Sequence, residues 1–266
     1  MKRTGLVSIT FRKYSPASII DLVKNAELDC IEWGGDVHVP HGDLARAREV
    51  GEQTRAAGVE VGAYGSYYYV GAPAKNRHTF EQVLETAQVL GAPLIRVWAG
   101  AQGSKETPES NWAKVVDESR RIGSLAQQAG IKIAFKFHAN TMNDTPDSSF
   151  ELKNDINHPN VFSLWQPNPS FERRENQRGL RRMRPGLANI QVFHFRNGMR
   201  LPLEDGMDDW KYYLLTARYG TEDFAALIEL VQQDAPSNFI RDARDLKKLV
   251  AHAMEQPLVP EEEVRN

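Results

Sequence analysis

Short apolar segments alternate with longer amphipathic segments along nearly the whole chain. The apolar segments have the composition of buried strands, and they lie at residues 5–11, 30–35, 60–69, 93–100, 132–138, 160–169, 189–197 and 224–231. The amphipathic segments have the apolar spacing of helices, and they lie at residues 15–27, 42–58, 78–92, 111–130, 148–157, 171–183, 208–220 and 236–254. Eight strand–helix pairs in about 250 residues are typical of an α/β protein with a (β/α)8 TIM barrel. We therefore expect a parallel sheet covered by helices on its outer face.

Residues that begin and end helices support this order. Ser15 followed by Pro16 fits one helix start, Thr79 fits another, and Gly130 fits a helix end. A doubly wound open sheet is the alternative, but no G-x-G-x-x-G follows the first apolar segment. No change in composition marks a linker. We therefore expect a single barrel domain over residues 1–253 and a loose acidic tail over residues 254–266.

Composition limits the classes of function. The chain has 266 residues, is 41% hydrophobic and 26% charged, and carries a formal net charge of -2, which disfavours nucleic acid as a partner. Cys30 is the one cysteine, so an internal disulfide is excluded and a reducing compartment is favoured. The first residues do not resemble a signal peptide, and no run approaches the ~20 apolar residues of a membrane span. We expect a cytoplasmic protein that binds neither nucleic acid nor membrane.

Polar and aromatic residues cluster near the ends of the predicted strands. In a (β/α)8 barrel the active site lies at the carboxyl ends of the strands. From the second strand onward, these ends carry Glu32, Trp33, Asp36 and His38, then Ser66, Tyr67 and Tyr68, Arg96 and Trp98, Lys136, His138 and Asn140, Trp165, Gln166 and Asn168, His194 and Arg196, and finally Glu229. Together they predict a pocket for a polyhydroxylated ligand such as a sugar. Core packing explains the tryptophans equally well, and the sequence leaves the direction of Arg96 open.

A lysine stands inside the fifth predicted strand, which reads KIAFKFH. Because side chains alternate along a strand, Phe135 and Phe137 share one face, and Lys136 shares the other with His138. Two phenylalanines pack well against helices, so we expect Lys136 to face the barrel interior. A buried lysine is costly unless it has a partner. Glu229, in the apolar stretch LIELV, raises the same question.

Several longer stretches are similar to a known family. DCIEWGGDVHVPHGDLARAREV, GAPLIRVWAG, FHANTMNDT, LWQPN and LIELVQQDAPSNFIRDA resemble the sugar phosphate isomerase/epimerase family with the xylose isomerase-like barrel. The resemblance covers nearly the whole chain to about residue 250. It implies a (β/α)8 barrel that isomerises or epimerises a sugar or sugar phosphate by moving a proton next to a carbonyl.

The resemblance also implies one divalent metal ion (Mn, Mg or Co), held by Glu, Asp, His and Glu on the fifth to eighth strands. The matching positions here are Lys136, Gln166, His194 and Glu229, so two of the four ligands are kept. A lysine ammonium ~4 Å from a divalent cation is repelled by roughly 8 kcal/mol at an effective dielectric of 20. If a metal is bound, its ligands are His194, Glu229 and Gln166.

Three interpretations of Lys136 remain open. In the first, the site is metal-free, Lys136 pairs with Glu229, and the catalytic residues are Glu229, Lys136 and His138. Substrate contacts are then expected from Glu32, Trp33, His38, Tyr67, Arg96, Trp98, Gln166 and Arg196. In the second, the barrel is catalytically inactive and only binds a sugar-like ligand. In the third, Lys136 points outward between helices.

Two further points concern partners. The expected partner is a small sugar or sugar phosphate, and homo-oligomer formation is left open. DNA-repair enzymes share this type of barrel, and the run ERRENQRGLRRMR at residues 172–184 is basic. Because this run lies on a predicted helix, a solvated helix face is the better explanation.

Overall fold

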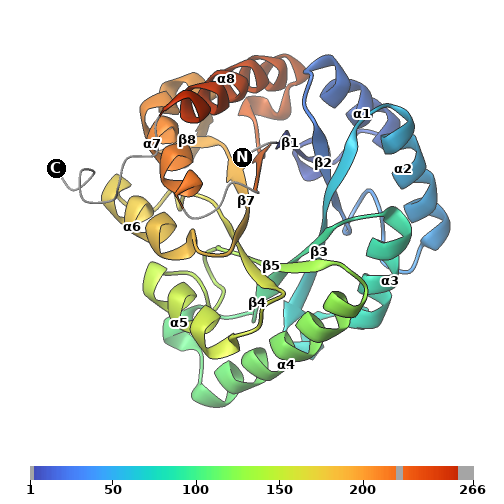
Figure 1. Cartoon of the computed structure of the whole chain (residues 1–266), viewed down its shortest axis with the longest axis vertical. Helices are drawn as coiled ribbons and strands as arrows, with labels where there is room; N and C mark the ends of the chain where they lie inside the picture. The colour runs from blue at the N-terminus through green and yellow to red at the C-terminus, as the bar shows by residue number, and fades with distance from the viewer. Residues whose placement is uncertain (1–2, 220–223, 257–266) are drawn as a thin grey trace.

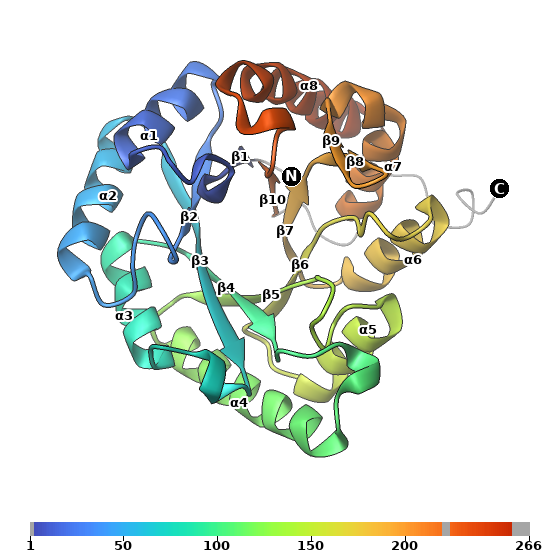
Figure 2. The same cartoon turned by 180° about the vertical axis from the view of Figure 1, so that it is seen from behind.

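A closed barrel of eight parallel strands forms the centre of the molecule, and helices surround it (Figures 1 and 2). The computed structural model describes residues 3–219 and 224–256. Around the barrel the strand order is β1-β10-β7-β6-β5-β4-β3-β2. The strands are β1 (Arg3–Val7), β2 (Cys30–Gly34), β3 (Glu60–Val70), β4 (Leu94–Ala99), β5 (Lys132–Lys136), β6 (Val161–Trp165), β7 (Leu187–Val192) and β10 (Ala225–Ile228). The predicted (β/α)8 TIM barrel is confirmed.

Eight α-helices lie outside the strands, in the order that the sequence predicts. They are α1 (Pro16–Asn25), α2 (Leu44–Ala56), α3 (Phe80–Leu90), α4 (Glu109–Gln128), α5 (Pro146–Ile156), α6 (Arg173–Met183), α7 (Met207–Arg218) and α8 (Pro236–Glu255). None of the helices in the described residues is long and apolar enough to cross a membrane. Because α8 extends to Glu255, the barrel ends slightly beyond the predicted boundary. Residues 257–266 of the predicted tail lie outside the described residues.

Capping residues explain where several helices begin. The Ser15 side chain accepts a hydrogen bond from the Ser18 backbone N–H, and Pro16 occupies the first turn of α1. Thr79 and Gln82 form a capping box at the start of α3. Each cap satisfies a backbone N–H that the helix itself leaves without a partner, so the chain leaves each loop at a defined residue.

The interior of the barrel holds apolar side chains, and polar side chains follow them toward the carboxyl ends of the strands. Two small apolar clusters lie inside the barrel: Val7, Ile9, Cys30, Ala225 and Leu227 form one, and Ala63, Leu94, Ala134 and Leu164 form the other. Side chains two residues apart on a strand share a face. Two residues after five of these apolar positions, at the carboxyl end of the barrel, come Glu32, Arg96, Lys136, Gln166 and Glu229. The alternation of side chains along the strands therefore places these polar groups next to the apolar clusters, toward the carboxyl ends of the strands.

The chain departs from the prediction after β7. The sequence predicts one strand over residues 189–197, but β7 ends at Val192, so that prediction is wrong. The strands β8 (His194–Arg196) and β9 (Met199–Leu201) pair antiparallel outside the barrel ring, beside α7 (Figure 2). Asn197 and Gly198 connect them with φ of 52° and 74°. Both residues adopt left-handed conformations readily, and an Asn-Gly pair favours a two-residue hairpin over a continuous strand.

Candidate functional site

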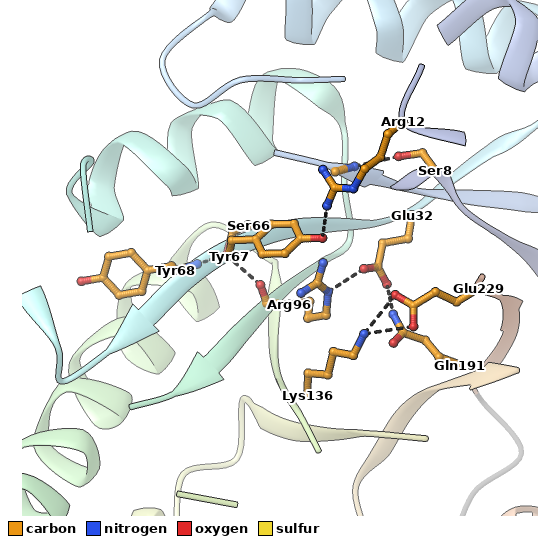
Figure 3. Close-up of polar contacts among 11 residues, drawn as sticks. Ser8, Arg12, Glu32, Ser66, Tyr67, Tyr68, Arg96, Lys136, Gln191 and Glu229 are labelled. Carbon is orange, nitrogen blue, oxygen red and sulfur yellow. Dashed lines mark hydrogen bonds and ion pairs between the residues drawn. The ribbon is translucent and has the colours of Figure 1, made fainter. Parts of the chain in front are cut away.

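Two buried ion pairs lie across the carboxyl end of the barrel (Figure 3). Lys136 Nζ donates to both carboxylate oxygens of Glu229, at 3.0 and 3.1 Å. Arg96 Nε donates to Glu32 Oε1 at 2.6 Å. The exposed fractions of the four side chains run from 0% to 6%. We call these four residues the charged layer; its two cations and two anions balance, so it can be buried without a net charge.

Burial and ion pairing have opposite effects on the pKa values of the two cations in the charged layer. Desolvation lowers the pKa of Lys136, and attraction to Glu229 offsets part of that effect. Desolvation also acts to lower the pKa of Arg96, but Glu32 and other groups outweigh it, and the net pKa is raised. Gln191 contacts one of the pairs, because its Nε2 donates to Glu32 Oε2 at 3.5 Å. Attraction to Glu229 therefore favours the charged form of Lys136 inside the barrel, whereas Arg96 is always charged.

Aromatic rings cover the charged layer. The Tyr67 ring centroid lies 4.6 Å from Arg96 Cζ, within the range of a cation–π contact. The Trp98 ring lies 5.6 Å from Arg96 Cζ and 5.8 Å from Lys136 Nζ. His138 packs edge-on against Trp98, with ring centroids 4.7 Å apart, and desolvation lowers its pKa. These rings give the site flat apolar walls beside its charges.

A bulge in β3 turns Tyr67 toward the barrel. The β3–β4 register shifts between Gly65 and Tyr68, and Tyr67 has a φ of 55°, which is unusual for a residue other than glycine. Ser66 Oγ donates to the Arg96 carbonyl at 2.7 Å and accepts from the Tyr68 N–H at 3.2 Å. Figure 3 shows Tyr67 and Tyr68 pointing in opposite directions. The bulge therefore sends one tyrosine over the charged layer and the next away from it.

Glycine at position 65 leaves the room that Arg96 needs. A Cβ atom on Gly65 would lie 2.4 Å from an Arg96 terminal nitrogen and 2.9 Å from Glu32 Oε1. On the outer side, Arg12 donates to the Tyr67 hydroxyl at 3.3 Å and to Asp36 Oδ2 at 2.5 Å. The position of Arg96 is thus set by backbone, carboxylate and ring together.

Several buried polar atoms near this layer have no hydrogen-bond partner within the described part of the chain. They are both terminal nitrogens of Arg96, Trp98 Nε1, Gln166 Oε1 and Gln191 Oε1. Each of these side chains is more than nine-tenths buried. Buried polar groups normally find partners, so such a cluster indicates a place that a ligand or water fills. Because it mixes donors and acceptors, it suits a ligand with hydroxyl and carbonyl groups.

The structure brings together most of the residues that the sequence singled out. Those in or around the charged layer are Glu32, Tyr67, Arg96, Trp98, Lys136, His138 and Glu229. Trp33 and His38 lie elsewhere. Trp33 packs outside the barrel and donates to Thr54 of α2, while His38 is buried next to Ser8, with Nδ1 2.8 Å from Ser8 Oγ. Lys136 faces the barrel interior, as we expected, so the third interpretation, in which it points outward between helices, is excluded.

His194 and Arg196 lie on the β8–β9 hairpin. The His194 ring lies against Gly206, where an added Cβ would be 2.5 Å from His194 Nδ1. His194 also lines a cavity of about 110 Å³ with Phe193 and Trp210. Arg196 is exposed. His194 thus lies on a hairpin outside the barrel ring, whereas Glu229 follows β10 directly.

The residues present do not fit the four-ligand metal site that the family resemblance implies. The Lys136 ammonium lies at both oxygens of Glu229. A divalent cation bound by this carboxylate would meet Nζ at ~4 Å, with repulsion of roughly 8 kcal/mol at a dielectric of 20. Elsewhere in the described residues, no three His, Cys, Asp or Glu side chains are grouped to bind a metal ion. The ammonium occupies the position where a cation would have to bind.

Three contributors were missed at the sequence level: Gln191, Gly65 and Arg12. Gln191 had a signal, because it is a polar residue in an otherwise apolar strand and faces the charged layer. For Gly65 and Arg12, the sequence carries no such signal, because their roles become visible only in the folded structure. Gly65 matters because of a close approach across strands, and Arg12 reaches Tyr67 from a turn far away in sequence.

This molecule is a (β/α)8 barrel, and its polar groups and aromatic rings gather at the carboxyl end, where proteins of this fold bind their ligands. The xylose isomerase-like TIM barrel family matches residues 20–246, and the chain belongs to this family. A 3-dehydroshikimate dehydratase from Bacillus anthracis is 28% identical over 127 residues, which are 44% of this chain. The aligned part spans only 41% of that dehydratase.

Solved structures share the fold at low sequence identity. The probable 3-DHS dehydratase from Bacillus anthracis has a TM-score of 0.76 at 19% identity, covering 93% of this chain and 99% of that one. An L-ribulose 3-epimerase has a TM-score of 0.74 at 12% identity, covering 100% and 99%. A xylose isomerase-like barrel from Mycobacterium smegmatis, in complex with magnesium, has a TM-score of 0.70 at 14% identity, covering 94% and 97%. At these identities the likeness concerns the fold alone.

Proposed function

We propose that this protein removes a proton from the carbon next to a carbonyl in a small polyhydroxylated compound, and does so without a metal. The reaction is an isomerisation or epimerisation of a sugar or sugar phosphate. One observation carries the proposal: an ammonium donates to both oxygens of a buried carboxylate at the carboxyl end of the barrel. A base next to a fixed positive charge is what enolate formation requires.

Glu229 is the base in this mechanism. Its carboxylate takes the proton, the electron pair of the broken C–H bond becomes part of the enolate, and the negative charge moves to the carbonyl oxygen. Lys136 then directs its hydrogen bonds to that oxygen and supplies the positive charge that a metal supplies elsewhere. To complete an isomerisation, Glu229 returns its proton to the former carbonyl carbon. The hydroxyl proton on the carbon that lost its C–H bond moves to the former carbonyl oxygen, so that this carbon becomes the new carbonyl.

Epimerisation needs a second proton carrier on the opposite face of the substrate. His138 is suited to be the base on that face, because desolvation lowers its pKa and favours the neutral imidazole; it takes up the proton there, while Glu229 in its protonated form gives a proton to the other face. Its ring packs against Trp98, whose indole also contacts Lys136. The unpartnered amide oxygens of Gln166 and Gln191 are available to accept from substrate hydroxyls.

Dehydration is a second candidate reaction. It begins with the same proton removal, after which the enolate expels a hydroxyl group as water. The aligned relative from Bacillus anthracis is named as a 3-dehydroshikimate dehydratase, and this favours the candidate. Cytoplasmic location and homo-oligomer formation stay predictions.

Exchange of the transferred hydrogen with solvent tests the proposal directly. The purified protein would be incubated in D2O with EDTA and a panel of ketoses, aldoses, their phosphates and 3-dehydroshikimate, and proton NMR would follow exchange and product formation. We expect exchange next to the carbonyl of at least one compound. Glu229→Gln should abolish it, and Glu52→Gln, at an exposed position on α2, should not.

Two outcomes would overturn the proposal. Exchange that appears only after divalent metal is added would show that Lys136 does not replace the metal. Binding of panel compounds without any exchange would show a non-catalytic, ligand-binding barrel.

A further inference from the structure

Arg96 has more hydrogen-bonding capacity than the protein uses. Its Nε–H is bound by Glu32, but among the described residues neither terminal nitrogen has a hydrogen-bond partner. The side chain is 1% exposed. A buried guanidinium normally satisfies most of its five N–H groups. An entire edge of Arg96, formed by its two terminal nitrogens, is therefore left for something other than protein.

The protein fixes this edge in place. Glu32 binds the Nε side through one oxygen, the Tyr67 ring lies over the guanidinium plane, and Gly65 leaves room for a terminal nitrogen. Arg96 lies two residues after Leu94, which belongs to one of the apolar clusters inside the barrel. Arg96 and Lys136 both contact the Trp98 ring. The edge is therefore pre-oriented beside the same Trp98 ring that Lys136 contacts.

Charge and shape select the group that fits. A planar carboxylate matches two N–H groups of a guanidinium edge with two parallel hydrogen bonds. A phosphate dianion would bring a third oxygen and a second negative charge close to Glu32 and Glu229, whose charges are already balanced within the layer. With neutral hydroxyls as ligands, Glu32 would be the one carboxylate paired with the guanidinium of Arg96.

We infer that Arg96 binds a carboxylate of the substrate, so that the substrate class is a hydroxy-keto acid. This rests on the proposed function, since it places the carboxylate at Arg96 and the reacting carbon at Glu229. Tyr67 is the group that must move for entry, because its ring covers Arg96. Its hydroxyl is held by Arg12, whose side chain is 49% exposed.

Binding of matched acids and neutral analogues tests the inference. The probes are shikimate and its methyl ester, with D-gluconate and D-glucitol as an open-chain pair and D-fructose 6-phosphate as the phosphate probe. Calorimetry would give dissociation constants for wild type, Arg96→Lys, and the double variant Arg96→Gln with Glu32→Gln, which leaves no carboxylate stranded. Arg46→Lys on α2 is the surface control.

We expect wild type to bind at least one acid about tenfold or more tightly than its neutral partner, because the neutral partner leaves the guanidinium edge unpaired. Arg96→Lys and the double variant should remove that preference while leaving the affinity for the neutral partner unchanged. Equal affinity for acids and neutral partners, equal weakening of both by Arg96→Lys, or tighter binding of the phosphate would overturn the inference.

The deuterium-exchange assay separates this inference from the proposed function. If neutral ketoses exchange and the acids do not bind, the proposed function stands and the carboxylate assignment fails. If the acids bind through Arg96 but no hydroxy-keto acid or sugar exchanges, the carboxylate assignment stands and the catalytic proposal fails.

Discussion

Removing one member of the Lys136–Glu229 pair should destabilise the protein far more than removing both. At the observed 3.0 Å and an effective dielectric of 20, the attraction is about 5 kcal/mol. Desolvation of two charges offsets most of that gain, since the side chains are only 6% and 3% exposed. A single substitution leaves the other charge buried without its partner, at a cost of about 3–5 kcal/mol.

A double-mutant cycle measures this coupling. Lys136→Met, Glu229→Gln and the double variant would be unfolded in urea at pH 7, with circular dichroism as the readout. We expect each single variant to lose about 3–5 kcal/mol and the double variant to lose less than either of them, which corresponds to a coupling of at least about 3 kcal/mol.

A surface pair provides the control. Lys211 and Asp208 also form an ion pair, at 3.3 Å, but their side chains are 44% and 87% exposed. The same cycle there should give a coupling below about 0.5 kcal/mol. If the Lys136 and Glu229 losses simply add, or if their coupling equals that of the surface pair, the reasoning about the charged layer is refuted.

Four further predictions concern metal, packing, a thiol and pH. Elemental analysis should find no stoichiometric divalent metal in wild type, and Lys136→Glu, which puts a second carboxylate beside Glu229, should gain thermal stability from Mn²⁺ that wild type does not gain. Gly65→Ala should cost about 1–3 kcal/mol in urea unfolding because its Cβ meets Arg96, whereas Gly130→Ala, with nothing within 4 Å, should lose only about 1 kcal/mol from its left-handed backbone. Burial raises the pKa of Cys30 to about 12, so the thiol should not react with a disulfide reagent at pH 8 until the protein unfolds; rapid reaction of the native protein would contradict this. Desolvation lowers the pKa of His38, His41, His138 and His194 from 6.5 in the folded protein. The unfolded state therefore binds more protons as the pH falls through that value, and the urea midpoint should decrease when the pH is lowered from 7.5 to 5.5. An unchanged midpoint would contradict the assignment to these four histidines.

The barrel and the direction of Lys136 could be predicted because both follow from local periodicity. Eight alternations of strand and helix give the fold, and a strand with Phe135 and Phe137 on one side must place Lys136 on the other. The pairing of Lys136 with Glu229 was one of three interpretations of the sequence, and it is the one that the structure shows. Periodicity is a strong signal wherever one face of a strand is buried.

Irregular backbone explains what could not be predicted. The direction of Arg96 depends on its neighbour β3, where a register shift and a left-handed Tyr67 change which side chains face the barrel. His194 lies outside the barrel ring because the chain leaves the sheet after Val192 and turns at Asn197. That Asn-Gly turn is readable in the sequence, but the strand-like residues before it outweighed it.

The charged layer also divides along the chain as it does in space. Glu32 and Arg96 belong to β2 and β4 in the first half of the barrel, while Lys136 and Glu229 come from β5 and the residue after β10 in the second half. A cut in the turn at Gly130, between α4 and β5, would therefore leave each fragment of four barrel strands with a complete, neutral ion pair. A cut between β3 and β4 would separate Glu32 from Arg96 and leave each fragment with an unmatched charge. Each half of the barrel thus carries a neutral ion pair of its own. Two fragments produced by a cut at Gly130 should therefore associate into the complete barrel.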